Sequence, residues 1–189
     1  MHEIFYDELR KLKVRFMEMG INVSEQIYRS TKSFIEHDKE LANEIVNDDQ
    51  EINSGEIQLE NQALKLIALQ QPVASDFRTI VSVLKASSDL ERIGDHAADI
   101  AEIIPHLVTV RKEGDPAVSQ AIAMGKKAHQ MILDALAALT AEDENAARRV
   151  IAADDEVDYD FNAIKHQLAQ EIAEDPGKVD AALDLLMVI

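Results

Sequence analysis

The chain has 189 residues, of which 19 are Lys or Arg and 36 are Asp or Glu, so its formal net charge is −17. This charge argues against nucleic-acid binding, which requires a surface rich in Lys and Arg. Six Gly, four Pro and no Cys exclude the collagen-like, low-complexity and disulfide-stabilised classes. A hydrophobic content of 47% is too high for a disordered chain.

The first residues, MHEIFYDELRKLKV, carry charges throughout and lack the apolar segment of a signal peptide. No apolar run approaches the roughly 20 residues that span a bilayer. We therefore expect a soluble cytoplasmic protein that does not insert into a membrane.

Apolar residues recur at steps of three and four along most of the chain, which is typical of amphipathic helices. The first such row begins with Tyr6, Leu9, Phe16 and Gly20, and Phe77 belongs to a later one. Turns are predicted around Asp38, before Pro72, in the segment RKEGDP at 111–116, near Thr140 and near Pro176. These signals predict six helices, at about 3–37, 40–71, 73–109, 116–140, 142–173 and 178–189.

An internal repeat becomes visible when the chain is shifted by 105 residues. Met19 and Gly20 then fall on Met124 and Gly125, and Asp38 falls on Asp143. The sequence therefore predicts an all-α fold of two tandem three-helix bundles, with a first copy at 1–110 and a second at 111–189. Because the last residue falls on Leu84, we expect the second copy to be truncated in its last helix.

The segment SSDLERIGDHAAD, from Ser87 to Asp99, has the strongest functional signal in the chain. Glu91 and Asp95 are four residues apart and share one helix face, which continues an apolar row. Two carboxylates on a face directed towards a core repel each other and lose hydration, and a bound cation would offset both effects. Oxygen ligands of this kind suit hard metals such as Mg²⁺, Mn²⁺ or Ca²⁺, and iron sites also use them.

The second predicted helix supplies further candidate ligands. Asp49 and Glu56 occupy positions of an otherwise apolar row, and Asn53 lies four residues after Asp49. In the second copy, Asp154 and Asp158 hold the places of Asp49 and Asn53. The alternative interpretation is that all of these acids are solvated on an acidic helix surface, which is the usual environment of Asp and Glu.

The remaining polar residues of the segment give weaker signals. His96 is expected on the surface or at a partner contact, and Arg92 is expected to pair with Asp89 or Asp99 rather than to bind an anion. Gly94 inside a helix predicts the close approach of another backbone. The chain lacks a P-loop, a GxGxxG motif and an HExxH motif, and no His follows a Glu by three residues. We therefore expect no enzyme activity.

The segment QPVASDFRTIVSVLKASSDLERIGDHAADIAE, from Gln71 to Glu102, closely resembles the signature of the PhoU family. The two-copy helical plan, the early YDELRKLK segment and the pair NDDQEI and ADDEVD extend the resemblance over nearly the whole chain. It implies a cytoplasmic negative regulator of the phosphate regulon and of phosphate uptake. Such proteins connect the ATPase of a phosphate ABC transporter to a sensor histidine kinase, and several are homodimers.

The resemblance also bears on the acids. Some members bind metal clusters through E/D-x-x-x-D motifs, a pattern that Glu91–Asp95 and Asp154–Asp158 match and that Asn53 breaks at Asp49. The implied cofactor is a divalent metal or an iron cluster, with Fe, Mn, Mg or Zn as candidates. The motif expected in the final helix is not in this chain. The competing hypotheses are a metal-dependent hydrolase and a metal-storage bundle that use the same acid pairs.

Overall fold

The computed structural model describes residues 2–107 and 114–189, and within these ranges all regular structure is helical. The six α-helices lie within a few residues of the predicted ranges, and α3 ends earlier than predicted, because Pro105 is part of a short 3₁₀ turn. The predicted division at 110/111 and the end of the third predicted helix at 109 lie outside the described residues. The elements are α1 (His2–Glu36), α2 (Lys39–Gln70), α3 (Ala74–Ile103), η1 (Ile104–His106), α4 (Pro116–Ala141), α5 (Glu144–Glu174), η2 (Pro176–Lys178) and α6 (Val179–Val188).

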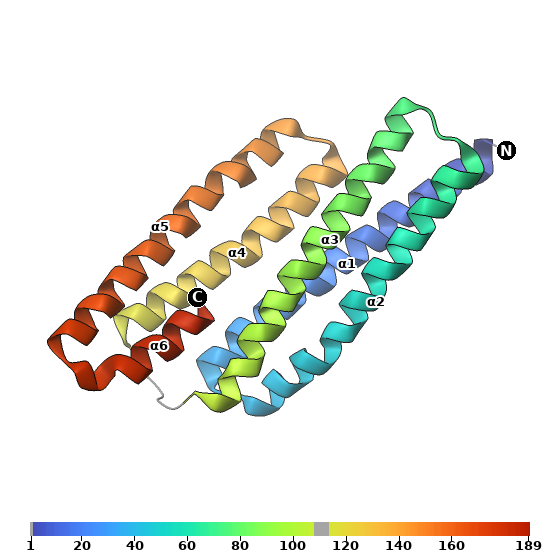
Figure 1. The fold of residues 1–189 in the computed structure, drawn as a ribbon. Helices are drawn as coiled ribbons and strands as arrows, with labels where there is room; N and C mark the ends of the chain where they lie inside the picture. The colour runs from blue at the N-terminus through green and yellow to red at the C-terminus, as the bar shows by residue number, and fades with distance from the viewer. Residues whose placement is uncertain (1, 108–113) are drawn as a thin grey trace.

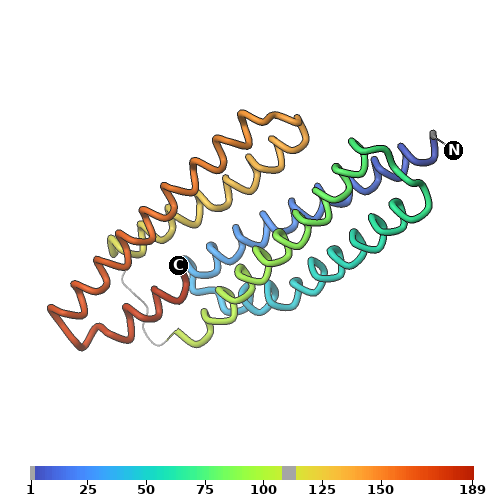
Figure 2. Tube along the Cα trace, turned by 45° about the horizontal axis from the view of Figure 1, so that its top comes forward, coloured from blue at the N-terminus to red at the C-terminus, as the bar shows by residue number. Residues whose placement is uncertain are grey.

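The helices form two bundles that lie side by side (Figure 1). The three long helices α1, α2 and α3 make the first bundle, and α4, α5 and the short α6 make the second. The bundles meet where α1 packs along α4 and where α3 contacts α6. The N-terminus lies at one end of the elongated molecule, and the C-terminus lies near its middle (Figure 2).

The turns within the two bundles confirm the repeat. His37 and Glu142, which are 105 residues apart, both adopt a left-handed conformation, with φ of 51° and 52°. The next residue in each copy, Asp38 or Asp143, caps the following helix: its carboxylate accepts hydrogen bonds of 2.9–3.0 Å from two backbone N–H groups. The same residue types therefore end one helix and begin the next at equivalent positions.

The two hydrophobic cores do not coincide with the two repeats. The first lies mainly among α1, α2 and α3 and includes the fully buried Leu12 and Ile80, but Leu136 of α4 also joins it. The second combines Phe34 and Ile45 of the first repeat with Ile164 of α5. Because each core draws on both repeats, their packing is interdependent.

The third helix of the second repeat, α6, covers only part of its neighbour α5. α2 buries six residues, whereas α5, which occupies the equivalent place, buries Ile164 and Leu168 alone. Ile151 of α5 is 73% exposed, although its counterpart Val46 is half-buried. The short α6 has 10 residues, whereas α3, at the equivalent place in the first repeat, has 30.

Candidate functional site

The predicted acids of α2 and α3 lie close enough to influence one another. Glu91 and Asp95 are half-buried on α3 and face the half-buried Asp49 and Glu56 of α2. Burial raises the pKa of Glu91 above its ordinary value, and the nearby negative charges of Asp95, Glu56 and Asp49 raise it further. The structure therefore brings together four of the six residues predicted as metal ligands.

These four carboxylates have no basic partner among the described residues. No Lys, Arg or His of residues 2–107 and 114–189 forms an ion pair with any of them. Arg29 of α1 instead pairs with Asp48 and Glu44 of α2, at 2.5 and 3.0 Å, and both acids raise the pKa of its guanidinium. The cluster is thus a local concentration of negative charge, which Arg92 of α3 offsets only in part.

Asp49 differs from the other acids because its two oxygens are already hydrogen-bonded. The Gln26 amide of α1 donates to Oδ1 at 3.1 Å, and the Asn53 amide donates to Oδ2 at 3.0 Å. The carbonyl oxygens of these two amides, Gln26 Oε1 and Asn53 Oδ1, are buried and have no hydrogen-bond partner. Unpaired amide oxygens next to carboxylates are themselves suitable ligands for a hard cation.

Gly94 explains how α1, α2 and α3 approach one another at this cluster. A Cβ at this position would lie 3.2 Å from Ile52 Cδ1 and 3.3 Å from Gln26 Oε1. The expected close approach is therefore made by two side chains and not by a backbone. Gln26 was not predicted as part of the site, although it follows the buried Val23 by three residues and precedes the buried Ser30 by four, as members of one helix face do.

The carboxylates do not form a complete metal site by themselves. Within the described ranges, no three or more His, Asp or Glu side chains are placed so that they could hold one ion. The oxygen atoms left without a hydrogen-bond partner beside Asp49 are the amide oxygens of Gln26 and Asn53. Carboxylate and amide oxygens favour Mg²⁺ or Mn²⁺ over Zn²⁺.

The acids of the second copy are in a different environment. Asp154 and Asp158 lie exposed on α5, and the backbone oxygen of Asp158 accepts a hydrogen bond of 2.8 Å from the Asn162 amide. Lys127 of α4 binds other acids of α5, Asp160 at 2.7 Å and Glu156 at 3.4 Å. The structure thus leaves Asp154 and Asp158 separate from the cluster on α2 and α3, and their role as metal ligands stays a prediction.

The polar residues beside Glu91 and Asp95 point to the surface. The side chain of His96 is 72% exposed and lies 3.8 Å from Asp99, and the side chain of Arg92 is 70% exposed and lies 3.7 Å from Asp89. These positions agree with the expectation of a surface histidine and of an arginine paired on its own helix. Surface ion pairs of this type stabilise a protein by at most about 1 kcal/mol.

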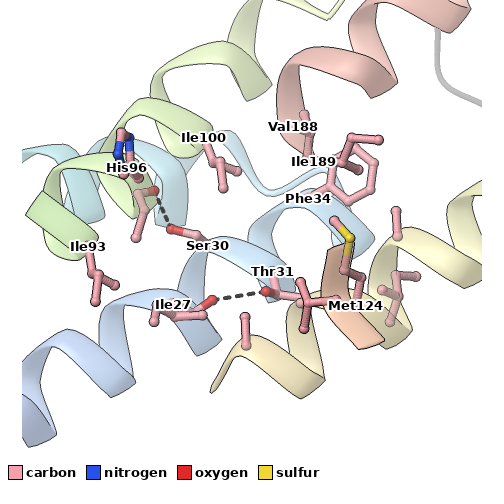
Figure 3. A pocket seen from close by; sticks show the side chains of 16 residues that line it. Ile27, Ser30, Thr31, Phe34, Ile93, His96, Ile100, Met124, Val188 and Ile189 are labelled. Carbon is pink, nitrogen blue, oxygen red and sulfur yellow. Dashed lines mark hydrogen bonds between the residues drawn. The ribbon is translucent and has the colours of Figure 1, made fainter. Parts of the chain in front are cut away.

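An apolar cavity of about 220 Å³ lies at the junction of the two bundles. Figure 3 shows Phe34 of α1 near Val188 and Ile189 at the end of α6. Two polar side chains of the lining are already satisfied: Ser30 donates to the Ala97 oxygen at 2.6 Å, and Thr31 donates to the Ile27 oxygen at 3.0 Å. The third, His96, has a side chain that is 72% exposed and lies 3.8 Å from Asp99.

The fold and the acid cluster define a helical protein built of two repeats. Comparison with known proteins finds a match to each repeat. The family model named PhoU domain matches residues 16–104 and again residues 122–189. The chain belongs to the PhoU family. The two matches begin 106 residues apart, which agrees with the repeat found in the sequence.

Related proteins and solved structures support the same assignment. A phosphate-specific transport system accessory protein PhoU homolog from Clostridium acetobutylicum is 35% identical over 98% of this chain and 84% of its own length. A homolog from Aquifex aeolicus is 31% identical over 97% of this chain and 82% of its own length.

Two crystal structures of PhoU proteins have the same fold. The phosphate transport system regulatory protein PhoU from Streptococcus pneumoniae superposes with a TM-score of 0.87 at 30% identity, over 97% of this chain and 86% of that one. PhoU from Pseudomonas aeruginosa gives a TM-score of 0.91 at 28% identity, over 97% of this chain and 88% of that one.

Proposed function

We propose that this chain is a negative regulator of phosphate-regulated genes and of phosphate uptake. It acts in the cytoplasm as an adaptor between the ATPase of a phosphate ABC transporter and a sensor histidine kinase. The observation that carries this proposal is the match to phosphate-specific transport system accessory proteins over nearly the whole chain. None of the helices in the described ranges is long and apolar enough to cross a lipid bilayer.

The surface of the molecule is compatible with protein contacts. On α3, Arg92, His96 and Asp99 expose 70–72% of their side chains along one face. Large apolar side chains are also exposed, including Ile21 at 57% and Tyr28 at 56% on α1. Aromatic and apolar anchors surrounded by polar residues are typical of protein interfaces. We expect the partners to be the ATPase, the kinase and a second copy of the chain, and not DNA, given the charge of −17.

The adaptor role is tested by reconstitution with purified components. The immobilised full chain is incubated with the transporter ATPase, with the cytoplasmic part of the kinase, and with both. Retention of each partner, and of both together, supports an adaptor. Retention of neither contradicts it. The control is the variant that combines Asp154→Asn with Asp158→Asn. Comparing its retention of the partners with that of the unaltered chain separates specific contacts from general attraction to an acidic protein.

We further propose that the Glu91–Asp95 pair binds a divalent cation, with the Gln26 and Asn53 amides as neutral ligands. The raised pKa of Glu91 and the two unpaired amide oxygens support this proposal. A cation would compensate the carboxylates and occupy the unsatisfied acceptors. Elemental analysis of the purified protein, before and after Glu91→Gln, identifies the metal and its dependence on this residue.

The hydrolase and metal-storage alternatives use the same residues but receive no support from the relatives, which are named as accessory proteins. A metal-dependent hydrolase would show turnover that Glu91→Ala abolishes. A storage protein would take up many ions per chain and not one at this cluster.

A further inference from the structure

A second concave site lies on the seam between α1 and α4, away from the acid cluster. It has a volume of about 520 Å³ and is lined from α1 by Tyr28, Lys32 and Ile35, and from α4 by Lys126 and His129. We propose that this seam site binds a phosphate monoester, with its phosphoryl group between Lys32 and Lys126 and its body against Tyr28 and Ile35.

The two lysines give the seam site its charge. Lys126 has no ion-pair partner among the described residues, and Lys32 has only Glu36, with 4.0 Å between Nζ and Oε2. Glu36 also lines this cavity, so the lining carries two ammonium groups and one carboxylate and keeps an excess of positive charge, in a chain whose net charge is −17. An anion between them would remove their mutual repulsion and gain charge-assisted hydrogen bonds.

The aromatic side chains give the seam site a fixed wall. The rings of Tyr28 and His129 meet edge to face, with 6.1 Å between their centroids. The His129 ring is held because Nδ1 donates to the backbone oxygen of Ser24 at 3.0 Å. In the neutral ring Nε2 is then an acceptor, so it can take a hydrogen bond from a hydroxyl of the ligand. The Tyr28 hydroxyl is the donor of this wall, since a phenolic O–H group can donate to an oxyanion.

The internal repeat shows that the helical packing does not require these residues. At the equivalent positions, Tyr28 corresponds to Leu133, Lys32 to Ala137, Lys126 to Ile21 and His129 to Ser24. The same α1–α4 seam is thus built a second time with neither the two lysines nor the aromatic pair. The cationic and aromatic groups therefore add a binding chemistry that the fold alone does not demand.

The volume of the seam site indicates the size of the ligand. A cavity of about 520 Å³ lies within the range of sites for small organic molecules, which is about 300–1,000 Å³, and far exceeds the volume of one phosphate ion. The apolar part of the lining, Ile35 and the face of Tyr28, suits the body of an ester. The same phosphoryl chemistry is also found in inorganic phosphate, so the experiment must separate the two sources.

The test is a binding titration of the purified full chain, so it does not depend on the proposed regulatory role. The probes are adenosine monophosphate, inorganic phosphate and adenosine, each without added metal. Binding of each probe is measured by calorimetry and by changes in NMR chemical shifts. The test variant is Lys32→Gln with Lys126→Gln. The control variant is Lys85→Gln with Lys178→Gln, which removes the same charge from exposed positions on α3 and η2.

We expect adenosine monophosphate to bind more tightly than phosphate and adenosine not to bind. The test variant should weaken binding at least about tenfold, because each lysine donates a charge-assisted hydrogen bond, and the control variant should not. Equal binding of inorganic phosphate with the same dependence on the lysines supports the phosphoryl site and identifies free phosphate as its ligand. No binding of either phosphate probe at millimolar concentration, or binding that the test variant leaves unchanged, overturns the proposal.

Discussion

Gly20 of α1 lies directly against Leu136 of α4, because a Cβ on Gly20 would be only 2.5 Å from Leu136 Cδ2. An equivalent contact exists with the two helices exchanged: a Cβ on Gly125 of α4 would be 3.1 Å from Thr31 Oγ1 of α1. Gly125 and Leu136 are the 105-residue counterparts of Gly20 and Thr31. The two repeats therefore meet through the same positions, as the subunits of a two-fold dimer do.

Replacing Gly20 by Ala should destabilise the protein. The added methyl group overlaps Leu136, and overpacking of this kind costs about 1–3 kcal/mol, whereas Ala improves helix propensity by about 1 kcal/mol. We expect a net loss of up to about 2 kcal/mol in the free energy of unfolding, measured in urea. Gly55→Ala is the matched control: no atom lies within 4 Å of its added Cβ, so it should gain about 0.5–1 kcal/mol. Equal effects of the two changes would disprove the tight seam.

The N-cap of α5 predicts a second stability effect. Asp143→Ala removes the acceptor of two backbone hydrogen bonds, from Asn145 and Ala146, and should cost about 0.5–2 kcal/mol. Asp155→Ala, at an exposed position inside the same helix, should not destabilise the protein. Thermal unfolding of both variants measures the difference, and an unaffected Asp143→Ala would show that this cap is dispensable.

The Glu91 carboxyl should make stability depend on pH. Its pKa is raised in the folded protein by burial and by Asp95, Glu56 and Asp49, so the folded chain holds this proton more tightly than the unfolded chain. The pKa of Glu91 in the unfolded chain is about 4.3. As the pH rises from this value through the raised pKa of the folded chain, the free energy of unfolding falls, and it stays lower at neutral pH. Glu91→Gln should stabilise the protein at pH 7, and this advantage should vanish at pH below about 4.

Glu60→Gln on α2 is the control for this pH effect, because the residue is exposed and removal of its charge changes the net charge equally. A comparison of the two variants by urea unfolding from pH 3 to pH 8 separates the local effect from the general one. Identical pH profiles for both variants would contradict the clustering of acids around Glu91.

Added Mg²⁺ or Mn²⁺ should raise the melting temperature of the unaltered protein, because a ligand that binds the folded state alone stabilises it. The rise should grow with metal concentration and disappear in Glu91→Gln with Asp95→Asn. Asp154→Asn with Asp158→Asn should keep it, since those acids are exposed on α5. A rise of the same size in all three proteins would indicate screening of surface charge instead of a site.

The sequence predicted the helices and their turns well, because Asp38, Asp143 and the proline positions act locally. It predicted the buried face of α1 less well. Phe5, Leu12 and Met19 are buried there, whereas Tyr6 is 53% exposed, although it began the predicted row. A residue near a helix end can fit the helical period and still stay exposed because no partner helix covers it. Phe77, near the start of α3, is 43% exposed. Burial at such positions depends on where the partner helices lie.

The candidate site was also predictable only in part, because sequence spacing shows which residues share a helix face but not which helices pack together. Glu91 and Asp95 follow from spacing along one helix, and Asp49 and Glu56 follow from interruptions of an apolar row. Gln26 comes from a third helix, and its bond to Asp49 depends on tertiary packing that no local pattern encodes. Acid spacing alone also does not reveal that two amides donate to Asp49 or that their own oxygens are unpaired.

The central claim, that this chain restrains phosphate-responsive transcription, is tested most directly by a phosphate-regulated reporter in a strain that lacks the gene and any paralogue. At high phosphate the reporter should be active in this strain, and the full chain supplied from a plasmid should switch it off again. Reporter activity that stays repressed at high phosphate after the deletion would contradict the account.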